Sequence, residues 1–175
     1  MVSMKTKAAL VAEIDGLVSA LKERLDGSDG VDAEREFIGS RVPERLVPVA
    51  RALPTLSMHM LAALAEGEAD GEPVSVVGLA ARTGRPKGTV SKHVQRLVEA
   101  GLVERTPVPG NRKEVQLHLT ADGRLVADAH AQMHVEMTRG LREFLQRYSS
   151  ADLQVLTRIL TDLLAARRDG VRIVP

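Results

Sequence analysis

Two short helices and a hairpin follow one another with few spare residues between Ser75 and Leu119. Ser75 is a residue type favoured at a helix N-cap, and the first helix is expected to end at Gly84. Pro86 suits the first turn of the second helix, and Gly101 ends it. This close spacing of starts and stops leaves the segment few alternative folds.

Apolar spacing gives each of these elements a buried face. The first helix buries Val76 or Val77, Leu79 and Ala80, and the second buries Val90, Val94 and Leu97. Residues 103–105 and 115–119 are typical of strands, with 107–113 as the loop between them. The order is that of a winged helix-turn-helix, in which a short basic helix is placed to enter the DNA major groove.

The composition favours a mainly α (α+β) protein. The chain has 175 residues, 44% hydrophobic but only 2% aromatic, so its core must be built from Leu, Val, Ala and Met. It has no cysteine, which excludes disulfides, thiol catalysis and thiolate zinc sites. No signal peptide or long apolar run is evident, so we expect a soluble protein in the cytoplasm.

Positive charge is concentrated in the same stretch. The segment from Arg82 to Lys113 contains eight basic and two acidic residues. Its net charge is therefore +6, in a chain whose total net charge is +1. The rest of the chain therefore carries −5. A basic patch on an otherwise acidic protein is the pattern expected for binding a polyanion with one face, although a solvated charged surface gives the same pattern.

Helices are expected on both sides of this domain. Residues 4–25 form an amphipathic stretch, 26–30 resemble a loop, and a second helix starts near Asp32 and kinks or restarts around Pro43 and Pro48. Thr120 caps a long helix to about Arg147, and Ser149 and Ser150 cap a last one. The terminal helices are too long to bury their apolar stripes alone, which predicts a homodimer. The expected domains are 1–54 and 121–175 for dimerisation and 55–120 for DNA binding.

Several short motifs mark these elements: Leu79-Ala80, Val90-Ser91, Leu97, Gly101-Leu102-Val103 and Leu119-Thr120-Ala121-Asp122-Gly123. With these motifs in register, the chain resembles the MarR family of bacterial winged-helix transcription regulators over residues 32–168. The resemblance implies a homodimer whose two winged domains read a near-palindrome in duplex DNA, and repression is the family default. It also implies a bacterial protein that is located at the nucleoid when bound to DNA.

The wing departs from the family pattern. Gly110 stands where the resemblance places a wing-tip arginine, Asn111 replaces an acid and Lys113 replaces the last arginine. Arg112 lies beside the vacant position and is a substitute for minor-groove contact. We therefore expect the second helix to contribute more to recognition than the wing.

The outward positions of the second helix carry only hydrogen-bonding or cationic side chains. Thr89, Ser91 and Lys87 suit base edges or the thymine methyl, and the other side chains suit base edges or phosphates. The predicted DNA-binding residues are Arg85, Lys87, Thr89, Ser91, Lys92, Gln95, Arg96, Arg112 and Lys113.

Three histidines form a candidate metal site. His130 and His134 are spaced to share one helix face, and the resemblance to the zinc-sensing branch of the family adds His59. That branch has an acidic fourth ligand where this chain has Arg41, with Glu36 and Glu44 close by. Three imidazoles and one carboxylate would suit tetrahedral zinc, whereas the alternative is that these are ordinary polar residues lining a cleft.

The other effector hypothesis is a small organic ligand, often an anionic aromatic in this family, in a cleft lined by Arg51, Met58, His59 and Met133. No cofactor is required under either hypothesis. The sequence has no nucleophile motif or glycine-rich phosphate loop, so we expect no enzyme. We expect a ligand-responsive repressor that binds a palindromic operator. The alternatives are a zinc-responsive regulator of the same fold and a non-specific architectural DNA-binding protein.

Overall fold

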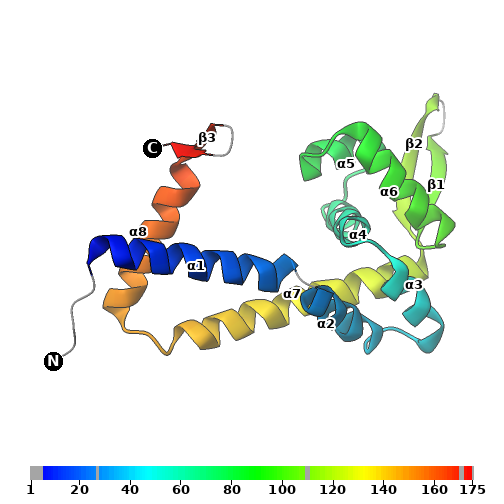
Figure 1. Cartoon of the computed structure of the whole chain (residues 1–175). Helices are drawn as coiled ribbons and strands as arrows, with labels where there is room; N and C mark the ends of the chain where they lie inside the picture. Colours follow the sequence, from blue (N-terminus) through cyan, green and yellow to red (C-terminus); the bar gives the residue numbers. More distant parts are fainter. Residues whose placement is uncertain (1–5, 27, 109–110, 170–171, 175) are drawn as a thin grey trace. The chain divides into compact units, whose positions relative to one another are not determined.

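The computed structural model describes residues 6–26, 28–108, 111–169 and 172–174, with side chains described for 6–21, 32–107 and 115–166 (Figure 1). The described chain is mainly helical with two small antiparallel sheets, which confirms the predicted fold class. It divides into two compact units, residues 1–133 and 134–175, each taken here by itself. Among the described residues no single helix is long and apolar enough to cross a membrane; only the bent pair 44–52 and 55–69 passes that test together.

The first unit begins with α1 (Lys7–Asp26) and α2 (Ser28–Gly39). The prediction of a loop over 26–30 with a helix starting near Asp32 was wrong, because α2 already begins at Ser28. Serine and aspartate suit the first turn of a helix as well as they suit a loop, since both residue types serve the unpaired N–H groups there. Composition alone therefore could not separate the two.

A new helix begins at each proline, which is one of the two predicted outcomes; the other was a kink. Pro43 is the N-cap of the 3₁₀ helix η1 (Glu44–Leu46), and Pro48 lies in the first turn of α3 (Val47–Ala52). Pro54 precedes α4 (Thr55–Ala69) as its N-cap. Proline fits these positions because the N–H group that it lacks would have no hydrogen-bond partner within the first turn of a helix.

The helix-turn-helix consists of α5 (Val76–Thr83) and α6 (Lys87–Glu99). The predicted caps are confirmed: Ser75 Oγ accepts a hydrogen bond from Gly78 N at 3.1 Å, and Gly84 closes α5 with φ of 62°. That left-handed conformation favours glycine, and it lets the chain turn within three residues into α6.

The wing is an antiparallel pair, β1 (Val103–Val108) and β2 (Asn111–Leu119), with Val103 opposite Leu119. Both strands extend further than the predicted 103–105 and 115–119. The intervening loop is correspondingly shorter than 107–113, because strand pairing continues past Pro107 through an irregularity in the register. A proline can occupy an edge strand where its missing N–H interrupts no ladder.

The core of the first unit combines α4, α5, α6, the wing and the start of α7 (Ala121–Leu145), which Figure 1 shows grouped together. Its largest fully buried apolar side chains are aliphatic or Met, as composition predicted, and none is aromatic. They are Met60, Leu61, Leu64, Leu79, Val90, Val94, Leu97, Leu102, Leu117 and Val126.

Two polar side chains join the wing to its neighbours. Thr120 Oγ1 donates to Gly101 O at 2.7 Å and accepts from Gly123 N at 3.0 Å, so the predicted N-cap of α7 also holds the end of the hairpin. Glu68 of α4 accepts from Leu119 N at 2.9 Å, and its other oxygen lies 3.1 Å from Arg124 Nη1 of α7. Helix α4, strand β2 and helix α7 therefore share one half-buried carboxylate.

A buried hydrogen bond connects α4 to α6. Ser57 Oγ and His93 Nδ1 lie 2.8 Å apart, and both side chains are buried. Burial lowers the pKa of His93, and the nearby charges of Arg96 and Lys92 lower it further. The fold therefore favours the neutral imidazole at the contact between α4 and α6.

The second unit contains the remainder of α7, α8 (Ser150–Ala165) and a short hairpin of β3 (Arg167–Asp169) and β4 (Arg172–Val174) that the sequence did not predict. Ser149 caps α8 as predicted, in a reciprocal capping box with Asp152. None of the residues of α8 is buried. Its exposed large apolar side chains are Val155, Leu156, Ile159, Leu160, Leu163 and Leu164.

We predict that Gly123→Ala lowers the free energy of unfolding by about 1–3 kcal/mol or more. An added Cβ would lie 1.9 Å from Leu102 O, a backbone atom that cannot rotate away. Gly140→Ala is the matched control on the same helix, where no neighbouring atom is within 4 Å; it should gain about 0.5–1 kcal/mol from helix propensity. Urea denaturation at one protein concentration measures both, and equal effects would contradict the close approach.

We also predict that acid destabilises the wild type more than His93→Asn. In the unfolded chain this histidine binds a proton near its ordinary pKa of about 6.5, whereas the pKa of folded His93 is lowered. Below that pH, protonation therefore favours the unfolded chain and lowers the free energy of unfolding. Asparagine keeps a hydrogen-bonding atom toward Ser57 but does not titrate. Urea midpoints at about pH 7.5 and about pH 5.5 test this, and an identical pH response of both proteins would contradict it.

Candidate nucleic-acid interface and histidine cluster

Helix α6 separates its side chains between a buried and an exposed face. Val90, Val94 and Leu97 are buried as predicted, and His93 joins them. Of the predicted DNA-binding residues, Thr89 and Arg96 are half-buried and the others on this helix are exposed: Lys87, Ser91, Lys92 and Gln95. The outer face of α6 therefore carries polar and cationic groups, with the carboxylate of Glu99 in the last turn.

Gln95 is engaged within the protein, which the sequence did not reveal. Its amide oxygen accepts from Arg105 Nη1 at 2.8 Å, and its Nε2 donates to Glu99 at 2.9 Å. Arg105 belongs to β1, so the bond joins the wing to the outer face of α6. A base contact by Gln95 would have to replace one of these hydrogen bonds.

The basic stretch is not uniformly available to a ligand. Arg82 is paired with Asp70 and Glu72 at 3.0 and 3.1 Å, and its hydrogen bond to Asp70 is the main cause of its raised pKa. Arg85, Lys87 and Lys92 are exposed, and the described side chains provide no ion pair to any of the three. Among the described side chains of this stretch, positive charge without an ion-pair partner lies at the start of α6 and on its outer face.

The wing contacts stay predictions. Arg112 and Lys113 belong to β2, but their side chains are outside the described set, and Gly110 is outside the described residues altogether. The described part of the wing presents Arg105 toward Gln95.

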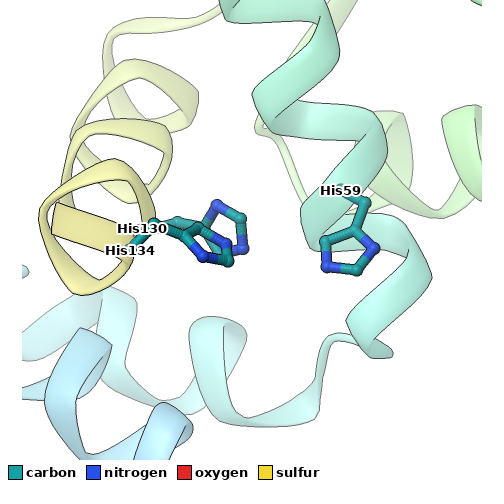
Figure 2. Close-up of side chains that lie close together, drawn as sticks. All are labelled: His59, His130 and His134. Carbon is teal, nitrogen blue, oxygen red and sulfur yellow. The ribbon is translucent and has the colours of Figure 1, made fainter. Parts of the chain in front are cut away.

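His59, His130 and His134 lie close together, as Figure 2 shows. Each can offer one ring nitrogen such that the three atoms lie within 4.8 Å of one another. His59 comes from α4 and His130 from α7, with ring centroids 5.8 Å apart, and His134 follows one turn later on the same continuous helix. His130 is buried, whereas His59 and His134 are exposed.

This donor set fits a zinc ion in part. Zinc binds imidazole nitrogens at about 2.0–2.1 Å, so tetrahedral ligands lie roughly 3.3 Å apart, closer than the 4.8 Å within which the three nitrogens lie here. No carboxylate of the described residues belongs to the group. Arg41, at the place of the expected acid, lies 3.5 Å above the Phe37 ring.

The acids proposed as substitutes lie elsewhere. Glu36 lines a separate hollow together with Arg51, and Glu44 is exposed at the start of η1. On α7, Glu136 pairs with Arg139. The cluster is therefore a set of three imidazole donors among the residues described.

The proposed organic-ligand cleft does not form one cavity among the described residues. Met58 and Met133 are buried in the core, and the cavity lined by Met58 and His130 has a volume of about 20 Å³, room for one water molecule. Arg51 is exposed on the separate hollow of about 440 Å³. A binding site made of these residues stays a prediction.

Residues 53–114 match the model of the MarR family. The HTH-type transcriptional regulator YhjH of Bacillus subtilis is 30% identical over 95 residues, 54% of this chain and 54% of that protein. The match thus spans about half the length of that relative.

Solved structures share the fold. Zinc-responsive ZitR of Lactococcus lactis, a MarR family member, superimposes with a TM-score of 0.56 at 21% identity, covering 65% of this chain and 75% of ZitR. FabT of Streptococcus pneumoniae, crystallised in complex with DNA, gives 0.52 at 21% identity over 89% and 90%. Together with the helix-turn-helix and wing described above, these matches show that the chain is similar to the MarR family over residues 53–114 and shares the fold of solved members of that family.

Proposed function

We propose that this chain is a sequence-specific regulator that binds double-stranded DNA by inserting α6 into the major groove. The observation that carries the proposal is the division of α6 into a fully buried apolar face and an outer face of Lys87, Ser91, Lys92 and Gln95. Such a helix is rigidly held and presents donors that can reach base edges and phosphates. The shared fold of FabT, which was crystallised with DNA, supports the same use.

The proposed regulator acts as a homodimer. The large apolar side chains of α8 from Val155 to Leu164 are exposed, and α1 has its own exposed stripe of Leu10, Ile14, Leu17 and Leu21. Exposed contiguous apolar surface is a mark of an interaction site, and a second copy would cover it at residues 1–54 and 121–175. Two copies of α6 then predict an operator with twofold symmetry.

Repression follows from the family resemblance and is part of the proposal. A regulator of this kind responds to an effector only if the effector binds the DNA-competent and DNA-incompetent dimers with different affinities. A ligand contacting both α4 and α7 is suited to that role, since α4 packs against α6.

Selection from random duplexes tests the main proposal. We expect an inverted repeat with half-site centres about 10 base pairs apart, one turn of DNA. Retention of all sequences alike would instead indicate a non-specific architectural protein, and a lone half-site would contradict the dimer.

Two variants distinguish phosphate contacts, which position the protein on DNA, from base contacts, which determine sequence preference. Arg96→Ala should weaken binding to every duplex and lower the slope of log affinity against log salt by about 1, because one phosphate contact is lost. Thr89→Ala should keep that slope and relax the preference at one base position. An unchanged slope for Arg96→Ala would exclude its phosphate contact, and identical base preferences would exclude reading by Thr89.

The histidine cluster supports a second candidate, a zinc-responsive regulator. His59, His130 and His134 would hold the ion, and the neighbour ZitR is zinc-responsive. A bound Zn²⁺ would supply a cross-link between α4 and α7. The three side chains would bind it through neutral imidazole nitrogens, so affinity would fall as pH falls.

We predict that equilibrium dialysis detects zinc bound to the wild type and that His134→Ala lowers the zinc affinity by more than about 10-fold. His118→Ala is the matched control, because His118 lies beside Glu68 and outside the cluster. Absence of bound zinc in the wild type would end this candidate, and an equal loss in both variants would place the ion elsewhere.

A further inference from the structure

Three exposed side chains form a hydrogen-bonded chain from the wing to the end of α6. Arg105 of β1 donates from Nη1 to the amide oxygen of Gln95 at 2.8 Å. Gln95 Nε2 then donates to Oε1 of Glu99, one turn further along α6, at 2.9 Å. Helix α6 and strand β1 pack against each other (Figure 1), so this chain spans a contact within one compact unit.

The two end groups decide which way the Gln95 amide points. A guanidinium can only donate hydrogen bonds, and a carboxylate can only accept them. The amide therefore satisfies both neighbours only with its oxygen toward Arg105 and its nitrogen toward Glu99. A glutamine without such neighbours could turn its amide to suit different base edges, whereas Gln95 is held in one orientation.

DNA would compete unequally for the two hydrogen bonds of Gln95. A phosphate carries a full negative charge, so it attracts the Arg105 guanidinium more strongly than the neutral amide oxygen does. The acceptors on base edges are neutral, so the Glu99 carboxylate holds the amide nitrogen more strongly than they do. Contact with DNA therefore favours breaking the bond to Arg105 and keeping the bond to Glu99.

We infer that Glu99 is a specificity-determining residue, because it restricts Gln95 to reading base edges as a hydrogen-bond acceptor. The inference rests on the proposed entry of α6 into the major groove. Once Arg105 has moved to a phosphate, the free group of Gln95 is its oxygen, and the donors in the major groove are the amino groups of adenine and cytosine. A glutamine amide free at both ends would instead select adenine alone, through two hydrogen bonds.

Selection from random duplexes with single variants of the full chain tests this role. The wild type should prefer adenine or cytosine over guanine or thymine at one position of each half-site, and Gln95→Ala should lose that preference. Glu99→Ala should narrow it to adenine, by about fivefold or more over cytosine, because the freed amide then makes two hydrogen bonds to adenine. This variant should fold, since alanine favours helix and an acid in the last turn opposes the helix dipole.

Glu104→Ala is the matched control for the loss of charge. Glu104 is an exposed carboxylate of β1, and no hydrogen bond among the described residues joins it to Gln95. The control should therefore keep the wild-type base preference. A preference that narrows to adenine in both variants would assign the effect to net charge and overturn the role of Glu99.

The other end of the chain is tested by the salt dependence of binding. Arg105→Ala should lower the slope of log affinity against log salt by about 1, because a phosphate contact is lost. It should keep the preference for adenine or cytosine, since Glu99 still holds the amide nitrogen. Arg105→Lys keeps the charge and should keep the slope. An unchanged slope in Arg105→Ala would overturn the movement of Arg105 to a phosphate.

The selection also distinguishes a failure of this inference from a failure of the proposed function. A wild type that retains all duplexes alike would refute sequence-specific reading by α6 altogether. An inverted repeat in which the position sensitive to Gln95→Ala already selects adenine alone would support reading by α6 but overturn the role of Glu99. Identical preferences in the wild type, Gln95→Ala and Glu99→Ala would overturn base reading by Gln95 while the inverted repeat still supports the regulator.

Discussion

The packing of α6 against α4 is the interaction on which the rest of the structure depends. Val90, Val94 and Leu97 are fully buried, and the Ser57–His93 hydrogen bond fixes the rotation of one helix against the other. A buried hydrogen bond has a strict geometry, and leaving either partner unpaired costs about 1–3 kcal/mol. The apolar stripe supplies affinity between the helices, and the polar pair specifies which outer residues face the solvent.

Local signals in the sequence predicted the helix-turn-helix well. Ser75, Gly84, Thr120 and Ser149 mark ends that are decided by short-range hydrogen bonds or backbone conformation, so their residue types carry the information. The start of α2 at Ser28 was missed, because the same residue types serve helix starts and loops. The hairpin was longer than predicted, since its extent depends on pairing between strands rather than on either strand alone.

The candidate sites were predictable to different degrees. The inward face of α6 and the pairing of His130 with His134 follow from helix periodicity, and the addition of His59 needed the family resemblance. Long-range partners had no signal in the sequence. Arg82 forms salt bridges with Asp70 and Glu72, and Arg105 donates a hydrogen bond to Gln95. These contacts depend on how separate elements pack together. For the same reason, the charges in the basic stretch could be counted from the sequence, but the sequence did not show which of them have an ion-pair partner.

The shared carboxylate of Glu68 has a mechanical consequence. It joins α4, the base of β2 and the first turns of α7, and α4 and α7 also carry His59 and His130. The two histidine-bearing helices are thus held together at a point that also fixes the base of β2. A ligand that drew His59 toward His130 would act on two helices whose contact at Glu68 also sets the position of the wing.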